Sequence, residues 1–206
     1  MGQIITETTF LSDEFDNLEK TKKDEEYLEY IKDHILNVKR SFVNYMIPLL
    51  KKNNISSMIS DEDLKAAIIK TAESVQHHDD SKFGDDEFDG YRARWYPTQK
   101  EKNGDQEYQD LIRAEYAKAW EHHYTVNGHH PLHWVDPKTK IAKDMTLDAI
   151  IEMLCDWEGM SLKFKTSTLK WYENDATDEK AAMTAKTREI VEDLLYNVLH
   201  NSISKE

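Results

Sequence analysis

Residues 27–50 read "YLEYIKDHILNVKRSFVNYMIPLL", and their apolar side chains recur at intervals of three and four residues. Such spacing gathers side chains on one face of an α-helix. We therefore expect a long helix over about residues 24–50. His34 falls on the same face as Ile31 and Val38, so the pattern directs an imidazole toward the core.

The composition of the 206 residues favours an all-α protein. Charged residues make up 33% and hydrophobic residues 39%, with only 6 Gly and 4 Pro, a balance typical of helix-rich chains rather than of sandwiches or barrels. Residues 1–23 have mixed charge and little periodicity. We expect a flexible arm at residues 1–23 and a single-domain helical bundle over residues 24–206.

Further helices are predicted along the chain. Ser60 is a good N-cap, because the acidic residues 61–63 follow it, and the helix that starts there is expected to run to about Lys82. We expect a short helix between residues 84 and 97 and longer ones over about 106–127, 145–164 and 178–200. The polar segments 98–106 and 166–179 are predicted to be loops.

The formal net charge of −13 excludes some partners. So acidic a surface repels the phosphates of duplex nucleic acid and of anionic membranes. No apolar run reaches the length of a membrane span, and the first residues lack the features of a signal peptide, so we expect a cytoplasmic protein. The single cysteine, Cys155, can form neither an intrachain disulfide nor a cysteine-based zinc site.

Residues 76–83, "QHHDDSKF", place two histidines beside two aspartates. Continued helical spacing from Val75 turns His78, Asp79 and Lys82 inward and leaves His77 and Asp80 outside. His123 also lies on an apolar face, and Asp156 lies in a helix that is apolar on most sides.

Buried imidazoles and carboxylates are costly unless they are paired or coordinated. Two interpretations follow. The side chains of His34, His78, Asp79, His123 and Asp156 could hold a divalent ion such as Mn, Fe, Co, Ni or Zn, or they could form a hydrogen-bonded network without an ion.

The order of these residues resembles the HD-domain superfamily of metal-dependent phosphohydrolases. The run "HDDSK" resembles the His-Asp-x-Gly-Lys motif of the cyclic-di-nucleotide phosphodiesterase branch, with Ser81 in place of glycine. "HHPLHW" resembles the His-His-Glu-x-Trp segment of that branch, from which Leu132 departs. The blocks "HDDSKF", "AWEHHYTVNGHHPLHW" and "EMLCDW" also resemble an uncharacterised family of small bacterial and phage proteins, over about residues 34–172.

The superfamily resemblance implies an HD-like fold with one or two metal ions. The ligands it implies for a first ion are His34, His78, Asp79 and Asp156. His123, with His129 or His130, would hold a second ion, and Asp79 is the candidate bridge. The ions would activate a water for attack on a small nucleotide or another small phosphorylated molecule.

Other residues are candidates for the reaction itself. Lys82 would balance charge on the phosphate. Glu152, one helical turn before Asp156, is either a partner that orients a ligand or a general base, and Asp79 also counts as catalytic. The candidate substrate contacts are Arg92 and Arg94 for a phosphate and Tyr91 and Trp134 for stacking on a base.

Two other functions are compatible with the same residues. The mixed-valent di-iron oxygenases of the superfamily have a similar ligand set and cleave C–C or C–P bonds with dioxygen. The third hypothesis is a non-catalytic binder of a phosphorylated signal molecule, a role that suits a phage-encoded protein. The sequence leaves a homo-oligomer open.

Overall fold

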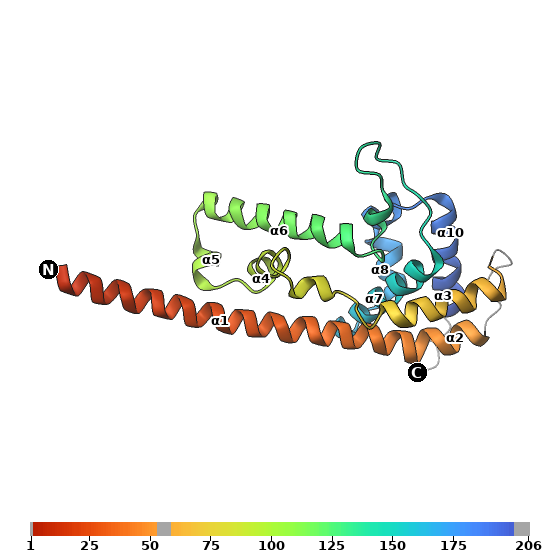
Figure 1. The fold of residues 1–206 in the computed structure, drawn as a ribbon, viewed down its shortest axis with the longest axis horizontal. Helices are drawn as coiled ribbons and strands as arrows, with labels where there is room; N and C mark the ends of the chain where they lie inside the picture. Colours follow the sequence, from red (N-terminus) through yellow and green to blue (C-terminus); the bar gives the residue numbers. More distant parts are fainter. Residues whose placement is uncertain (1, 53–58, 200–206) are drawn as a thin grey trace. The chain divides into compact units, whose positions relative to one another are not determined.

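The computed structural model describes residues 2–52 and 59–199. Within these ranges the regular elements are all helices, and the one β-type contact is an isolated bridge between Val135 and Ala142 (Figure 1). The all-α prediction is confirmed. Among the described residues, no helix combines the length and the apolar character that crossing a membrane requires.

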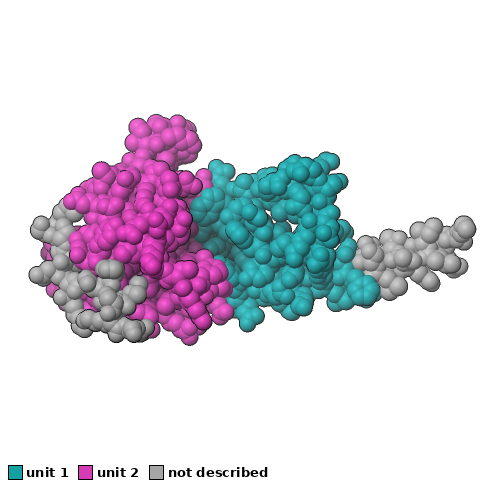
Figure 2. Space-filling model, turned by 180° about the vertical axis from the view of Figure 1, so that it is seen from behind, with its two compact units in different colours: residues 1–32, 80–123 teal, residues 33–79, 124–206 magenta. Residues whose placement is uncertain are grey.

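The chain forms two compact units, coloured separately in Figure 2. Unit 1 comprises residues 1–32 and 80–123, and unit 2 comprises residues 33–79 and 124–206. Each unit is therefore built from two separate segments of the chain. The prediction of one domain over residues 24–206 stays a prediction.

The core of unit 2 is built around helix α7, Leu147–Phe164, which buries side chains on most of its circumference. Helices α3, Asp61–Ser74, and α10, Ala185–Leu194, pack on it, as does the π-helical turn η1, Ser41–Met46. Unit 2 also contains α2, Ile47–Lys52, α8, Thr168–Asn174, α9, Thr177–Ala181, the 3-10 turn η3, Pro131–Trp134, and the π-helical turn η4, Leu195–Leu199.

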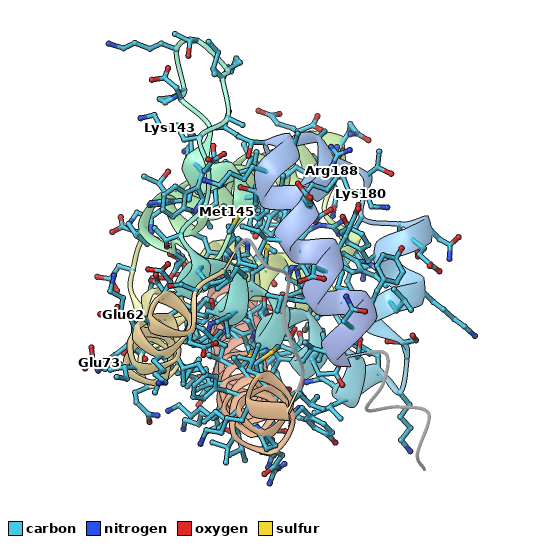
Figure 3. The ribbon with its side chains drawn as sticks, turned by 90° about the vertical axis from the view of Figure 1, so that its right-hand side faces the viewer. Glu62, Glu73, Lys143, Met145, Lys180 and Arg188 are labelled. Carbon is cyan, nitrogen blue, oxygen red and sulfur yellow. The ribbon has the colours of Figure 1, made fainter. Side chains whose placement is uncertain are left out.

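Polar contacts hold the N-terminal end of α7 against its neighbours. At its start, the backbone N–H of Met145 donates to Oγ1 of Thr187 at 3.0 Å, and Thr71 Oγ1 donates to the carbonyl of Asp148 at 3.1 Å. Figure 3 shows Met145 inside the unit, whereas Glu62 and Glu73 of α3 point outward. Helix α3 thus presents a charged face to solvent and an apolar face to α7, as its periodicity predicts.

Helix α7 approaches α1, Gly2–Arg40, closely at Gly159, where a side chain would crowd Val38. A Cβ on Gly159 would lie 3.1 Å from both Cγ2 and the backbone N of Val38. We expect Gly159→Ala to lower the free energy of unfolding by about 1–3 kcal/mol through overpacking. Urea unfolding measures this change. Gly128→Ala is the matched control, because a Cβ there meets nothing within 4 Å; an equal loss in both variants would contradict the explanation.

Unit 1 packs helix α4, Phe88–Trp95, between the first part of α1 and α6, Gln106–Val126. The ring of Tyr27 in α1 lies 5.2 Å from that of Phe88, and a Cβ on Gly90 would lie 2.8 Å from Cβ of Ala119. The 3-10 turn η2, Asp80–Phe83, leads into α4, and α5, Gln99–Asn103, joins α4 to α6. The predicted helices over 84–97 and 106–127 are confirmed.

Helix α1 begins at Gly2, so the sequence prediction placed the start of this helix too late, whereas the flexibility of residues 1–23 stays a prediction. Phe15 and Leu18, among the first side chains of this helix that the structure describes, are 70% and 63% exposed. Charge pairs support it instead: Lys20 contacts Asp24 at 3.2 Å one turn away. A search for apolar periodicity does not detect such a helix.

Two predicted loops also contain helices. Thr98 and Glu101 form a reciprocal capping box that starts α5 within the segment 98–106. Ser167 accepts a hydrogen bond from the N–H of Lys170 and so caps α8. The last helix was predicted to be continuous over 178–200 but is interrupted, because Thr184 caps a new helix, α10.

Candidate metal centre

A sharp turn after α3 delivers two consecutive polar side chains to the core of unit 2. The helix ends at Ser74 rather than near Lys82, which corrects the sequence prediction. His78 and Asp79 are each 1% exposed, whereas His77 and Asp80 are exposed. The predicted directions are thus right although the predicted helix is wrong.

The backbone of Asp79 explains how two neighbours can both be buried. Its φ of 58° lies in the left-handed region, which aspartate tolerates better than most residues. Side chains of consecutive residues in a helix diverge by about 100°, so the predicted helix would place this pair at the two edges of its inward face, whereas the turn buries both. Unusual backbone of this kind often occurs at functional sites.

The first cluster of donor atoms lies inside unit 2. His34 Nε2 is 3.1 Å from Asp156 Oδ1 and 3.3 Å from Asp79 Oδ2. His78 Nε2 is 3.4 Å from His34 Nε2, 3.6 Å from Asp79 Oδ2 and 3.8 Å from Asp156 Oδ1. Donor atoms on α1, the turn after α3, and α7 therefore converge on one point.

These spacings fit a single divalent ion. Ligand bonds of about 2.0–2.2 Å at tetrahedral angles place neighbouring donor atoms about 3.3–3.6 Å apart. The five separations above, from 3.1 to 3.8 Å, bracket that range, and the donor atoms of His34, His78 and Asp156 all lie within 4.8 Å of one another. Two imidazole nitrogens and two carboxylate oxygens also form a donor set that borderline divalent ions favour.

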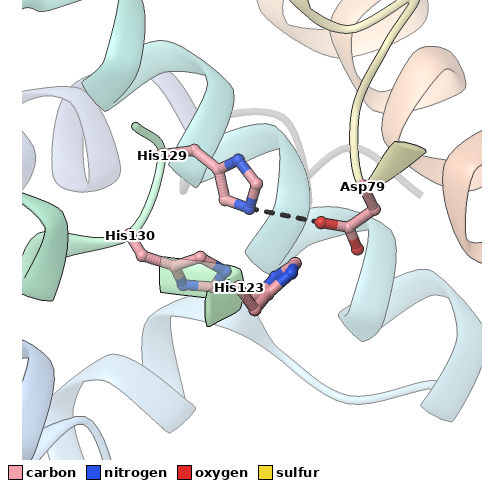
Figure 4. Close-up of side chains that lie close together, drawn as sticks. All are labelled: Asp79, His123, His129 and His130. Atoms are coloured by element: carbon pink, nitrogen blue, oxygen red, sulfur yellow. Dashed lines mark ion pairs between the residues drawn. The ribbon is translucent and has the colours of Figure 1, made fainter. Parts of the chain in front are cut away.

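A second cluster adjoins the first through Asp79. Oδ1 of this residue, the oxygen opposite the one facing His34, lies 3.5 Å from His129 Nε2 (Figure 4). The ring of His130 is 4.3 Å from that of His129, and one donor atom from each of Asp79, His129 and His130 lies within 4.8 Å of the others. The carboxylate of Asp79 thus faces both clusters, as a bridging ligand would.

Glu152, on α7, contacts the outer nitrogens of two imidazoles. Its Oε1 lies 2.9 Å from His78 Nδ1 and 3.4 Å from His129 Nδ1. A carboxylate oxygen accepts hydrogen bonds, so this contact favours a proton on each Nδ1 and leaves each Nε2 to act as a ligand. Of the two roles predicted for Glu152, the geometry favours the orienting partner over the general base.

The pKa values of the cluster reflect mutual stabilisation of opposite charges. Burial alone would lower the pKa of His78, but Asp79, Asp156 and Glu152 raise it to about 10. Burial opposes the same change at His34, whose pKa is nevertheless raised by Asp156 and Asp79. With neutral imidazoles, the carboxylates would leave uncompensated negative charge in the core, which bound protons or a cation must neutralise.

The pKa values of Glu152 and Asp156, the two carboxylates of α7 that contact these imidazoles, shift in the opposite direction. Burial would raise the pKa of Glu152, but hydrogen bonds from His129 and His78 lower it to about 2. Asp156 is likewise pulled well below its usual pKa by His34 and His78 despite its burial. Both carboxylates are therefore ionised at neutral pH and available to a cation.

Comparison with known proteins places the sequence in a family. Residues 23–197 match the model of the family of unknown function DUF5662. The chain belongs to this family. No curated protein and no solved structure matches it. The matched span of DUF5662 contains all the donor residues of both clusters, and the description of the family assigns them no activity.

In unit 1, His123 is buried and held by a carboxylate that the sequence analysis missed. Glu87 accepts from Nδ1 of His123 through Oε2 and from Nδ1 of His122 through Oε1, both at 2.8 Å. Burial would raise the pKa of Glu87, but the bond with His123 lowers it. Glu87 follows no periodic pattern, so spacing could not single it out. That His123 binds a second ion stays a prediction.

The predicted substrate contacts in unit 1 have varied surroundings. Arg92 is buried, with Nη1 2.5 Å from Glu101 Oε2 and Nε 3.1 Å from Asp24 Oδ1, so these carboxylates already engage its guanidinium. This geometry favours a structural role over the predicted grip on phosphate. Lys82 is half-buried, with Nζ 5.3 Å from the ring centre of Tyr91.

Arg94 and Trp134, the remaining candidates for substrate contact, differ in their exposure and in their contacts. Arg94 is exposed and lies over the ring of Trp95 at 4.9 Å. Trp134, in unit 2, donates from Nε1 to the carbonyl of Gly128 at 2.8 Å and packs against the core. Trp134 thus supports the loop that carries His129 and His130, whereas Arg94 is accessible to a ligand.

Proposed function

We propose that this protein is a metal-dependent phosphohydrolase of the HD type that acts on a small nucleotide or another small phosphorylated molecule. One observation carries the proposal: the donor atoms of His34, His78 and Asp156 form one group, and Asp79 Oδ2 lies 3.3 Å and 3.6 Å from the two imidazole nitrogens of that group. The order of these residues along the chain supports the same assignment.

The proposed ligands divide between two positions. His34, His78, Asp79 and Asp156 would hold a first ion, which we take to be Mn, Fe, Co, Ni or Zn because of the mixed nitrogen and oxygen donors. Asp79, with His129 and His130, would hold a second, to which the sequence prediction adds His123. Bound ions of this kind lower the pKa of water and stabilise charge on phosphoryl oxygens.

The protein's own groups would then place the substrate. Lys82 carries a positive charge at the end of the turn that bears His78 and Asp79, and it is our candidate for contact with the phosphate. Tyr91 and the exposed Arg94 are candidates for the remainder of the substrate. Arg92 is left out, because Glu101 and Asp24 already engage its guanidinium.

The reaction class can be tested with purified protein. We expect phosphate release from at least one member of a panel of nucleotides and sugar phosphates in the presence of Mn²⁺ or Co²⁺, without oxygen uptake. Asp79→Asn should reduce this release by at least about 100-fold, since it removes a charged ligand shared by both positions. Asp80→Asn, a change at the exposed neighbour, should leave release unchanged.

A di-iron oxygenase is the second candidate, because the two carboxylate oxygens of Asp79 face adjacent clusters as a bridging ligand would. An oxygenase would retain two irons and consume oxygen with a polyol or a phosphonate. Oxygen uptake without phosphate release would replace the hydrolase proposal. Tight binding of a nucleotide without turnover by the metal-loaded protein would instead favour a non-catalytic binder. Cytoplasmic location and self-association stay predictions.

A further inference from the structure

A single carboxylate oxygen lies between the imidazoles of the two candidate ion positions. Oε1 of Glu152 is 2.9 Å from Nδ1 of His78, which belongs to the first position, and 3.4 Å from Nδ1 of His129, which belongs to the second. The two rings are themselves 4.4 Å apart, and both side chains are almost fully buried. The two positions therefore share one supporting group.

We propose that Glu152 is a positioning residue that orients His78 and His129 together and so determines the occupancy of both ion positions. The inference rests on the metal binding proposed above and on none of the reaction chemistry. It differs from a role as general base, because Glu152 would act through the two imidazoles and without touching the substrate.

The chemistry of imidazole gives the physical basis. A neutral histidine has one protonated ring nitrogen and one free lone pair, and only the lone pair can bind a metal. Hydrogen bonds to Oε1 favour protonation of Nδ1 on both rings, which leaves both Nε2 lone pairs for ions. Nε2 of His78 lies 3.4 Å from that of His34, and Nε2 of His129 lies 3.5 Å from Asp79 Oδ1, as this arrangement requires.

The backbone makes Glu152 a rigid support. Glu152 precedes Asp156 by four residues in α7, so the positioning carboxylate and a candidate ligand project from the same face of one helix. The helix is buried on most sides, which limits movement of either side chain. In unit 1, Glu87 contacts Nδ1 of His122 and His123 in the same manner, so the described residues include a second glutamate that holds two imidazoles.

The proposal separates Glu152 from the ligands. Loss of His34 should weaken the first position alone, and loss of His130 should weaken the second alone. Loss of the shared carboxylate should weaken both, and substitutions of such orienting partners typically reduce metal affinity by about 10–100-fold. Glutamine keeps an acceptor oxygen but loses the charge, so Glu152→Gln should have a smaller effect than Glu152→Ala.

The experiment is a calorimetric titration of the full-length, metal-free protein with Zn²⁺ alone. We expect two binding events in the wild type, and both dissociation constants should rise by about 10–100-fold in Glu152→Gln and further in Glu152→Ala. Glu158→Gln is the matched control: Glu158 is a buried carboxylate on the same helix, but it accepts from Thr168 Oγ1 at 2.6 Å. This control should keep both affinities.

A second measurement reports the protonation and metal binding of each imidazole nitrogen. In the Zn²⁺-loaded wild type, nitrogen-15 NMR of the histidine side chains should show protonated Nδ1 and metal-bound Nε2 for His78 and His129. In Glu152→Gln at saturating Zn²⁺, the Nδ1 protons of both residues should exchange faster with water. A purely structural role for Glu152 would not affect these two histidines selectively, and circular dichroism identifies a variant that fails to fold.

Each outcome has one meaning. Wild-type protein that binds no Zn²⁺ contradicts the proposed function itself. Wild-type protein that binds two ions, with Glu152 variants that retain both affinities or lose only one, contradicts the shared role and leaves the proposed function intact. A single binding event in the wild type, or an equal loss in Glu158→Gln, also overturns the inference. If Glu152→Ala does not fold, the result for Glu152→Gln decides.

Discussion

Saturation with a divalent ion should raise the melting temperature of the metal-free protein by about 5–10 °C, and His78→Ala should abolish most of this rise. A ligand at 100 times its dissociation constant stabilises the folded state by about 2.7 kcal/mol if it does not bind the unfolded chain. For a chain of this size, 1 kcal/mol corresponds to about 2–4 °C. Differential scanning calorimetry with Mn²⁺, with Zn²⁺ and with a chelator measures the shift.

The physical reason is the buried charge around His78. The carboxylates of Asp79, Glu152 and Asp156 lie close to His78 in the core of unit 2, and an ion would neutralise negative charge among them. Alanine at position 78 removes a donor atom and also leaves Glu152 without its closest imidazole.

His77→Ala is the control for this prediction. It removes the neighbouring imidazole, which is exposed, and should preserve the whole metal-dependent shift. An equal loss in the two variants, or a wild type whose melting temperature does not respond to any of the ions, would contradict the assignment of the first cluster.

Periodicity was sufficient to place most of the candidate ligands. His34 lies on the apolar face of a helix that the spacing identifies, and Glu152 follows from its position one turn before Asp156. The sequence could predict these positions because a helix fixes the direction of each side chain. Neighbouring helices supply the distances between them, which no local pattern encodes.

The sequence prediction of helix boundaries was wrong where a local backbone or capping interaction, rather than apolar periodicity, determines the structure. Asp79 adopts a left-handed backbone that ends the regular spacing, so the turn at His78 could not be derived from the helix before it. The capping box of Thr98 starts a helix in a stretch that polarity and an Asn-Gly pair made look like a loop. Glu87 could be found only from the fold, because its partners lie 35 and 36 residues away.

Metal binding should release protons, and the apparent affinity should therefore rise with pH. The pKa of His78 is raised to about 10, so at pH 7 the metal-free protein carries a proton on this imidazole, and the raised pKa of His34 favours a proton there as well. An ion can bind only after these protons leave. Each proton released makes the apparent affinity rise about tenfold per pH unit.

The same shifts give the metal-free protein a defined pH dependence of stability. His78, with a folded pKa above its unfolded value of 6.5, contributes stability that is fully present below pH 6.5 and is lost as the pH rises toward 10. Glu152, whose folded pKa of about 2 is below its unfolded value of 4.5, contributes stability above pH 4.5 that is lost as the pH falls toward 2. The stabilisation by metal should therefore be greatest on the alkaline side, where the protons no longer compete.

Calorimetric titrations at pH 7 in two buffers with different ionisation enthalpies count the protons released per ion. We expect between one and two in the wild type, and fewer in His34→Ala, because one of the protonated imidazoles is gone. An apparent affinity that is constant between pH 6 and pH 8, with no difference between the buffers, would show that the ion binds elsewhere. Such a result would leave the buried cluster as a network of paired charges, the interpretation in which protons already supply the positive charge that the carboxylates require.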